Sequence, residues 1–165
     1  MKNLHFLTIL AILLTAGCNP IVETESVDLD AVNDTITLEI TKYQNAWNAK
    51  DIDVFTELVS DDCRFFGSDP SEILDKAGLI NMYAEYFAES TDFSYSVELR
   101  EVMPASDGKS AIVVEHITMS GWTPKMPMRH STHFVKVNDT WKIDFISWGF
   151  IVRNDDVQKL NEVLQ

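Results

Sequence analysis

Histidines and carboxylates are the side chains of this sequence that could bind a metal ion or transfer protons. His130 and His133 have the H-x-x-H spacing of paired metal ligands, but their segment alternates like a β-strand. Residues three apart on a strand point to opposite faces, and so do adjacent residues such as Glu115 and His116. Neither pair can share one ion, so we expect no metal site.

Proton transfer needs an imidazole or a carboxyl group in a dry cavity, where burial shifts its pKa toward neutrality. The candidates are His133, His116 and Asp69. Each also has a purely structural interpretation, because Asp69 stands before a proline in a turn and strand histidines are commonly hydrogen-bonded within the sheet. Asp144 lies between two apolar neighbours on a strand and is expected to point outward.

The direction of Arg129 and His133 depends on which face of the segment 128–137 is buried. Both share a face with Val135 and Val137. The two apolar valines predict that this face is the inner one, which turns Arg129 and His133 toward a cavity. An inward arginine would pair with a carboxylate or bind an acidic ligand.

The segment 111–122 has two alternating faces that compete for the interior. One face carries Val113 and Glu115, and the other carries Val114 and His116. Hydrophobicity does not decide between them, and a single β-bulge would exchange them. The sequence therefore leaves open whether Glu115 or His116 faces inward.

The elements that must position these residues divide into helices first and strands afterwards. Apolar residues recur every three or four positions over 29–47 and predict a long helix with Asp28 at its start. A short helix follows Asp51, and a third follows Asp75. A short strand over 63–66 ends at the turn Gly67-Ser68-Asp69-Pro70.

Beyond residue 90 the apolar period changes to two, which is typical of half-buried strands. Four strands and a final helix capped by Asn154 complete the chain. The predicted strands cover 93–99, 111–122, 128–137 and 141–152. We therefore expect an α+β fold, with helices on one face of an antiparallel meander.

The chain begins with the pattern of an export signal. One positive charge, Lys2, precedes an apolar run over 4–14, which is too short for a spanning helix of about 20 residues. Small residues at 15–17 stand immediately before Cys18 and look like a lipobox, at which signal peptidase cuts. Residues 1–17 are then the signal peptide, and Cys18 receives diacylglycerol and palmitate.

The predicted mature chain is a lipid-anchored protein of the cell envelope, at the outer membrane. We divide it into a lipidated cysteine with a flexible tether over 18–28 and a domain over 29–165. Acylation of Cys18 leaves Cys63 without a disulfide partner, and its apolar neighbours predict a buried, inert thiol. The net charge of −13 excludes nucleic acid as a partner, because phosphates would be repelled.

Three stretches carry a resemblance to a known family. They are Ala46–Asp53 at the end of the first helix, Phe66–Glu72 followed by Gly78, and Arg129–Ser131 with Asn138–Ile143 in the last hairpin. In this order they resemble the SnoaL-like branch of the nuclear transport factor 2-like superfamily. The match spans residues 30 to 150.

This resemblance implies a curved, mainly antiparallel sheet wrapped as a cone around the long helix, with two further helices and an apolar cavity open at one end. It also implies a homodimer that packs through the sheet. Many members carry a histidine where this chain has Ser147, which weakens the case for an enzyme. We place the ligand pocket at Tyr43, Trp47, Phe66, Tyr83, Phe87, Arg129 and His133.

The leading hypothesis is a domain that binds a small, largely apolar ligand without a cofactor and without established catalysis. The first alternative is a cofactor-independent enzyme of the isomerase, dehydratase or cyclase type that uses His133 or His116 as acid–base. The second is a non-catalytic dimeric assembly module. A fold of this kind predicts a pocket but not a reaction.

Overall fold

The first helix, α1 (Leu29–Ala49), follows the apolar repeat of the sequence. Asp28 begins it, because its carboxylate accepts a hydrogen bond from the Ala31 N–H at 3.0 Å. It ends at Lys50, whose backbone is left-handed with φ 60°. The side chains that it buries are Ile36, Ile40, Tyr43, Ala46 and Trp47.

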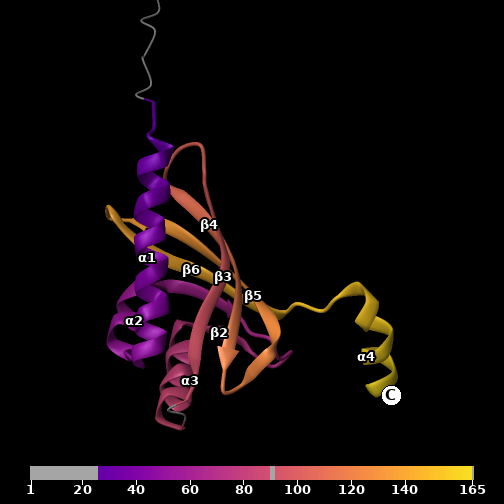
Figure 1. Cartoon of the computed structure of the whole chain (residues 1–165). Coiled ribbons are helices and arrows are strands. Elements are labelled where there is room, and N and C mark those ends of the chain that lie inside the picture. The colour runs from indigo at the N-terminus through magenta and orange to yellow at the C-terminus, as the bar shows by residue number, and fades with distance from the viewer. Residues whose placement is uncertain (1–25, 90–91, 165) are drawn as a thin grey trace, which may run out of the picture.

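Two shorter helices pack beside α1 on the same face of the sheet (Figure 1). α2 (Ile52–Leu58) begins at the predicted cap Asp51, which accepts from the Val54 N–H at 3.1 Å. α3 (Lys76–Glu89) begins after Asp75, whose carboxylate accepts from the Gly78 N–H at 2.9 Å. Both start positions agree with the sequence prediction.

The six-stranded sheet has the order β2-β1-β6-β5-β4-β3. The predicted antiparallel meander is confirmed, and β1 extends it by pairing parallel to β6 while β2 pairs antiparallel to β1. The strands are β1 (Val59–Phe66), β2 (Ile73–Asp75), β3 (Ser94–Pro104), β4 (Ser110–Ser120), β5 (Thr123–Val137) and β6 (Thr140–Phe150).

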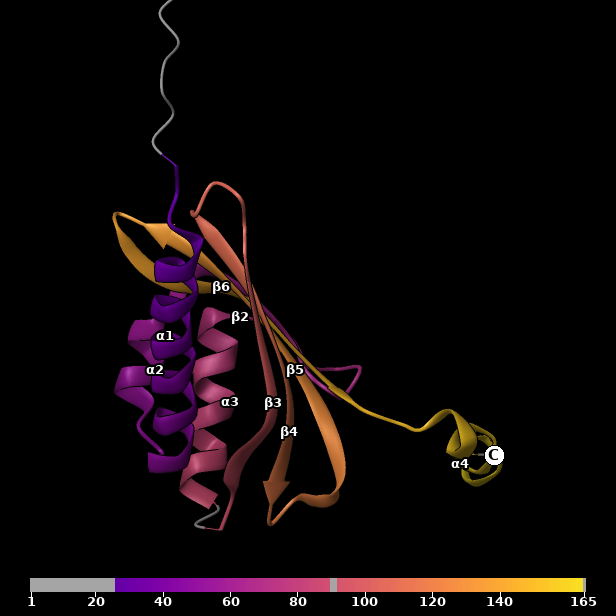
Figure 2. The same cartoon turned by 45° about the horizontal axis from the view of Figure 1, so that its top comes forward.

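Irregularities in pairing bend the meander and decide which side chains face inward. The pairing of β3 with β4 shifts between Val97 and Leu99, and the extra residue lies in β3. The pairing of β5 with β6 shifts where His133 faces Phe145 and Phe134 faces Ile143, and the extra residue lies in β6. Each shift exchanges the two faces of a strand and increases its curvature. The sheet therefore curls around α1, as Figure 2 shows.

The chain leaves the sheet after β6 and ends on the other side from α1 (Figures 1 and 2). A 3-10 turn, η1 (Asn154–Asp156), leads into α4 (Val157–Val163). The final helix is present as predicted, in addition to the two further helices expected from the resemblance. The prediction that Asn154 caps it is wrong, because Asn154 begins η1 and the N-cap position of α4 is Asp156, without a side-chain hydrogen bond. Its apolar side chains do not pack on the domain: Val163 is 82% exposed.

The computed structural model describes residues 26–89 and 92–164. The predicted signal peptide, Cys18 and most of the tether lie outside these residues, and their roles stay predictions. Within the described ranges no helix is long and apolar enough to cross a membrane.

Candidate functional site

A row of four inward side chains crosses the sheet beneath α1. Arg100 on β3 pairs in register with Glu115 on β4, Glu115 with His130 on β5, and His130 with Trp148 on β6. Glu115 and His130 are completely buried. The open question on β4 is thereby answered, since Glu115 faces inward and His116 outward.

The Glu115 carboxylate is the centre of this buried network. Its Oε1 accepts from Arg100 Nε at 2.6 Å. Its Oε2 accepts from the Tyr95 hydroxyl and lies 2.9 Å from His130 Nδ1. The other imidazole nitrogen, Nε2, lies 3.1 Å from the Thr132 hydroxyl. A buried carboxylate is tolerated here because its oxygens face donors and a cation.

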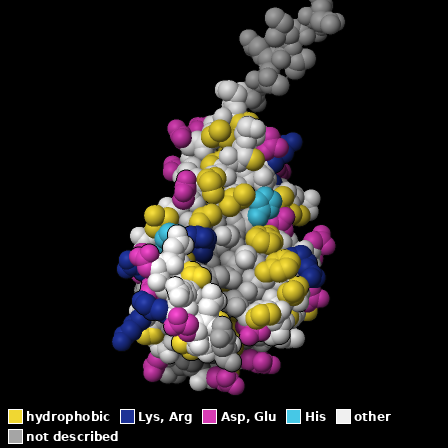
Figure 3. Space-filling view, turned by 90° about the vertical axis from the view of Figure 1, so that its right-hand side faces the viewer, with side chains coloured by type: hydrophobic (Ala, Val, Ile, Leu, Met, Phe, Trp, Pro, Cys, Tyr) yellow, Lys and Arg dark blue, Asp and Glu magenta, His cyan; other side chains and the backbone are white. Residues whose placement is uncertain are grey.

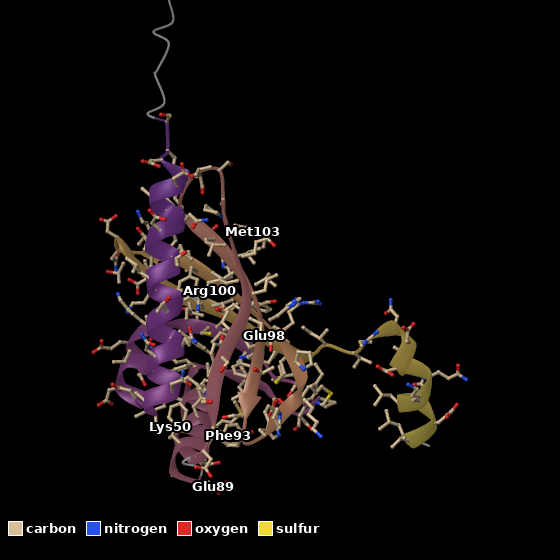
Figure 4. The ribbon with its side chains drawn as sticks, viewed as in Figure 1. Lys50, Glu89, Phe93, Glu98, Arg100 and Met103 are labelled. Carbon is tan, nitrogen blue, oxygen red and sulfur yellow. The ribbon has the colours of Figure 1, made fainter. Side chains whose placement is uncertain are left out.

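Helix α1 closes the network from above. Arg100 points from β3 toward α1 (Figure 4) and donates to Thr41 Oγ1 at 2.9 Å and to Gln44 Oε1 at 3.1 Å. The Tyr43 ring stacks on His130 with centroids 5.0 Å apart. The guanidinium therefore joins helix and sheet through charge-assisted hydrogen bonds.

Burial by itself would raise the pKa of Glu115, but the hydrogen bonds and charges of His130, Tyr95 and Arg100 outweigh it and hold this pKa below its ordinary value. Burial is the largest influence on the pKa of the two buried phenols Tyr95 and Tyr83. Burial raises the pKa of Tyr95 well above its ordinary value, and that of Tyr83 likewise. The carboxylate thus stays charged, and the phenols stay protonated.

An apolar cavity of about 140 Å³ lies beside this network, between α1, α3 and the sheet. The exposed fraction of each lining residue separates its floor from its rim. Trp47, Phe65, Tyr83, Met119 and Trp148 are at most 7% exposed and form the floor. Tyr86 and Trp122, which are 39% and 48% exposed, form the rim together with Phe93, Met82, Ser68 and Glu72.

Polar groups are few in the cavity. Glu72 Oε1 accepts from the Tyr86 hydroxyl at 3.3 Å, and Oε2 accepts from the Asp69 N–H at 3.1 Å. In the floor, the buried Trp47 Nε1 has no hydrogen-bond partner. A broader depression beside Thr56 and Ile80 is more open to solvent and carries the Lys76–Asp61 ion pair.

Trp148 separates the cavity from the buried network. Its indole lies 5.3 Å from Trp47 on the cavity side and 5.1 Å from His130 on the network side, measured between ring centroids. Like that of Trp47, its buried Nε1 has no hydrogen-bond partner in the described part of the chain. The imidazole is therefore one ring away from the cavity and does not line it.

Two of the predicted pocket residues, Trp47 and Tyr83, line the cavity. Tyr43 and Phe87 lie behind the lining: the Tyr43 hydroxyl is 3.3 Å from that of Tyr83, and the Phe87 ring packs on Trp47. The prediction for Phe66 is wrong by one position. Phe66 is 39% exposed on the outer face of β1, and Phe65 points into the cavity.

The inward direction predicted for Arg129 and His133 is also wrong. Arg129 is exposed, and His133 pairs with Asp144 on the outer face at 2.6 Å. Val135 and Val137 misled the prediction because they lie near the end of the strand, where Val137 is 42% exposed. Asp144 points outward as expected.

The remaining candidates lie away from the cavity floor. His116 is half-buried on the outer face of β4. Asp69 is exposed and holds the turn, with its carboxylate accepting from the Ser71 N–H at 2.8 Å. Ser147 also faces outward, and the inward position beside it belongs to Trp148.

Sequence reasoning missed Arg100, Glu115 and His130 as one unit. The three lie far apart in the sequence, and the bulge after Val97 turns Arg100 inward against the simple alternation of its strand. The sequence signal that could have indicated the buried network was the presence of charged and polar residues, such as Glu115, within otherwise apolar strand segments. Among the described residues, no three His, Cys, Asp or Glu side chains gather so that they could hold a metal ion.

Comparison with known structures places this geometry in a common fold. An NTF2-like protein of unknown function from Pseudomonas putida KT2440 aligns with a TM-score of 0.68 at 15% identity, over 79% of this chain and 93% of that one. An NTF2-like superfamily protein from Salmonella enterica serovar Typhimurium gives 0.62 at 18%, over 76% and 95%.

A third neighbour, from Streptomyces avermitilis, is described as a proposed dehydratase of the NTF2-like family. It aligns with a TM-score of 0.64 at 16% identity, over 75% of this chain and 99% of that one. No curated protein matches the sequence significantly. At these identities the neighbours show the fold alone. The SnoaL-like domain model matches residues 36–148, from the buried stripe of α1 to Trp148 beside the cavity, and the chain therefore belongs to the SnoaL-like domain family.

Proposed function

We propose that this protein binds a small, largely apolar molecule in the cavity between α1, α3 and the sheet. The observation that carries the proposal is the aromatic floor, in which Trp47, Tyr83 and Trp148 are buried yet line a cavity with an open rim. Ligand sites are typically apolar hollows with a few placed polar groups. Here Glu72, Ser68 and the Trp47 Nε1–H are those groups.

The size of the cavity limits the ligand. Its volume of about 140 Å³ is close to that of an engineered protein cavity of about 150 Å³ that binds benzene. A molecule with one ring therefore fits, and a fused system of four rings does not. An oxygen on the ligand would satisfy the Trp47 N–H, whose burial without a partner costs about 1–3 kcal/mol.

Binding fits this cavity better than acid–base catalysis. The titratable lining groups are Glu72 at the rim and the phenols of Tyr83 and Tyr86. Burial raises the pKa of both phenols, which keeps them protonated near neutrality. No imidazole belongs to the lining as far as the described residues go.

A thermal-shift titration with benzyl alcohol tests the proposal. At ten times its Kd, a ligand that binds only the folded state stabilises it by about 1.4 kcal/mol. For a chain of this length we expect a rise in Tm of about 3–6 °C. Ser68→Trp fills the rim and should abolish the rise, whereas the matched change Ser106→Trp on an exposed turn should not.

If the full chain shows no shift with benzyl alcohol, toluene or benzaldehyde at saturating concentration, the proposal fails. It fails equally if Ser68→Trp leaves the shift unchanged, because binding would then occur elsewhere. Fluorescence of the lining tryptophans gives a second readout of the same event.

A cofactor-independent isomerase or dehydratase is the second candidate. The His130–Glu115 pair favours it, because a buried imidazole hydrogen-bonded to a carboxylate is a typical acid–base unit and only the Trp148 ring separates it from the cavity. Deuterium exchange of the CH₂ protons of phenylacetone, followed by NMR, tests this function. Exchange above the buffer rate that disappears in His130→Gln would support it, and exchange at the buffer rate would refute it.

The attachment of the protein is part of the proposal. The lipobox-like segment before Cys18 supports an envelope lipoprotein, since two or more acyl chains hold a protein stably on a bilayer. Cys18→Ala should move the protein from the membrane fraction to the soluble fraction and remove lipid labelling. Retention of both would refute the anchor.

A second copy of the chain is the proposed partner of the outer sheet face. Apolar side chains gather there, beside histidines, on the face shown in Figure 3. They include Leu99, Ile112 and Phe145, which are 48%, 47% and 37% exposed. Exposed apolar patches of this kind mark interaction surfaces. Ile112→Lys should convert a dimer to a monomer in analytical ultracentrifugation, and a monomeric wild type would refute the interface.

A further inference from the structure

We propose that the cavity selects a ligand that carries a positive charge, namely a one-ring organic amine whose ammonium group lies at the rim against Glu72. This inference rests on the proposed ligand-binding function and adds the chemical class of the ligand. It is carried by the unpaired carboxylate of Glu72, by the aromatic rings at the same rim, and by the negative charge of the whole chain.

Glu72 is the charged member of the cavity lining. It forms no ion pair with a Lys or Arg of the described chain, whose ion pairs use other carboxylates. Its two oxygens accept one hydrogen bond each, from the Tyr86 hydroxyl and the Asp69 N–H. Since a carboxylate offers about four acceptor positions, Glu72 retains acceptor capacity for an ammonium group.

Aromatic rings share the rim with this carboxylate, and the Tyr86 hydroxyl donates to it. These rim rings belong to Tyr86, Trp122 and Phe93. Ring faces attract organic cations through their quadrupoles, and aromatic cages that hold ammonium groups are built in this way. An acidic ligand would meet the reverse situation: a carboxylate and the negative faces of the rings.

Lys50 is the cation that approaches the cavity wall, and it does not neutralise Glu72. Its Nζ donates to the Phe93 carbonyl at 2.8 Å and lies over the Phe87 and Phe93 rings at 5.5 and 5.7 Å. Figure 4 places Lys50 and Phe93 together at the lower end of α1. Lys50 does not line the cavity, and its ammonium group binds the Phe93 carbonyl rather than Glu72.

The charge of the whole chain acts in the same direction. A net charge of −13 produces a negative potential that concentrates cations near the surface and repels anions. The field acts on any cation, whereas the Glu72 carboxylate and the rim rings act only on one that enters the cavity. The two contributions can be separated by substitution.

The experiment compares three compounds of one size on the purified full chain in detergent at pH 7: benzylamine, benzyl alcohol and benzoate. Calorimetry and tryptophan fluorescence give the Kd of each. We expect benzylamine to bind at least about tenfold more tightly than benzyl alcohol, a difference of about 1.4 kcal/mol, and benzoate not to bind.

Two carboxylate variants locate the selectivity. Glu72→Gln should bring the Kd of benzylamine to within about threefold of that of benzyl alcohol, whose own Kd stays unchanged. Glu101→Gln makes the same change of charge at an exposed position on β3 and should leave the selectivity intact. If Glu72→Gln lowers the Tm strongly, Trp122→Leu replaces it, and the preference for the amine should fall by at least about half.

The outcomes separate the two proposals. Equal Kd values for the amine and the alcohol, or tighter binding of benzoate, would overturn the charge selectivity while leaving the binding function standing. The absence of binding by all three compounds would overturn both. Selectivity that Glu101→Gln reduces as much as Glu72→Gln would assign it to the general field and would also overturn the role of Glu72.

Discussion

Loss of the Glu115 charge should destabilise the fold more than any other single change of charge. In Glu115→Gln, the Arg100 guanidinium keeps its bonds to Thr41 and Gln44 but loses its counter-ion at 2.6 Å. Removing one partner of a buried ion pair costs about 3–5 kcal/mol. Because the Arg100 side chain is 18% exposed and water can reach it, we expect the lower end, about 3 kcal/mol.

Equilibrium urea unfolding at pH 7, followed by tryptophan fluorescence, measures this loss. With a slope of about 2 kcal/mol per M, a loss of 3 kcal/mol lowers the midpoint by about 1.5 M. Glu98→Gln makes the same change of charge at an exposed position within the bulge of β3 (Figure 4). It is the matched control and should change stability by less than about 0.5 kcal/mol.

A double variant tests the physical reason. Arg100→Met with Glu115→Leu removes both charges and leaves no orphaned ion, so it should be more stable than Glu115→Gln alone by at least about 1 kcal/mol. If the free energy of unfolding of Glu115→Gln falls by less than about 1 kcal/mol, or by no more than that of Glu98→Gln, the buried network does not hold α1 to the sheet through its charges.

Further predictions concern the pH dependence of stability, the Cys63 thiol and the position of the rim carboxylate. The pKa of Glu115 is lowered from its unfolded value of 4.5, so the stabilisation it contributes is complete above pH 4.5 and is lost as the pH falls below that value. A series of urea unfolding curves from pH 6 to pH 3 should therefore show a smaller loss of stability in Glu115→Gln than in the wild type. Equal losses in the two proteins would contradict this assignment. Burial raises the pKa of Cys63 to about 12, so Ellman's reagent should leave this thiol unmodified in the folded protein and should react with it in urea. Rapid reaction without denaturant would show that the thiol is accessible, against this prediction. A Cβ at Gly67 would lie 1.9 Å from Glu72 Oε2, so Gly67→Ala should displace the rim carboxylate. Benzylamine binding should then weaken while benzyl alcohol binding stays intact. Unchanged binding of both compounds would refute the position assigned to Glu72.

The helices could be predicted from local signals because their patterns are contained in a few turns of chain. Asp28 and Asp51 begin α1 and α2 through hydrogen bonds to residues three positions later. The buried stripe of α1 follows directly from the spacing of Ile36, Ile40 and Tyr43. The change to a period of two after residue 90 likewise predicted the antiparallel meander.

The directions of strand side chains required more than local pattern. A bulge of one residue exchanges the faces of everything beyond it, and it depends on how distant strands pair. Leu99 fits the predicted inward alternation but is 48% exposed, because the register shift after Val97 turns Arg100 inward instead. On β5 the apolar Val137 suggested the wrong face, since His130 is buried by its hydrogen bonds rather than by its hydrophobicity.

The sequence alone therefore determined the helices, the caps Asp28 and Asp51, the four strands of the meander and the acidic charge, since each is encoded in consecutive residues. It also predicts a lipid tether at Cys18. Only the tertiary structure decided that Arg100, Glu115, His130 and Trp148 form one row across four strands. It also decided that Glu72 stands at the rim of the cavity. The physical reason is that polar residues enter a core only with their partners, and here those partners come together through strand register.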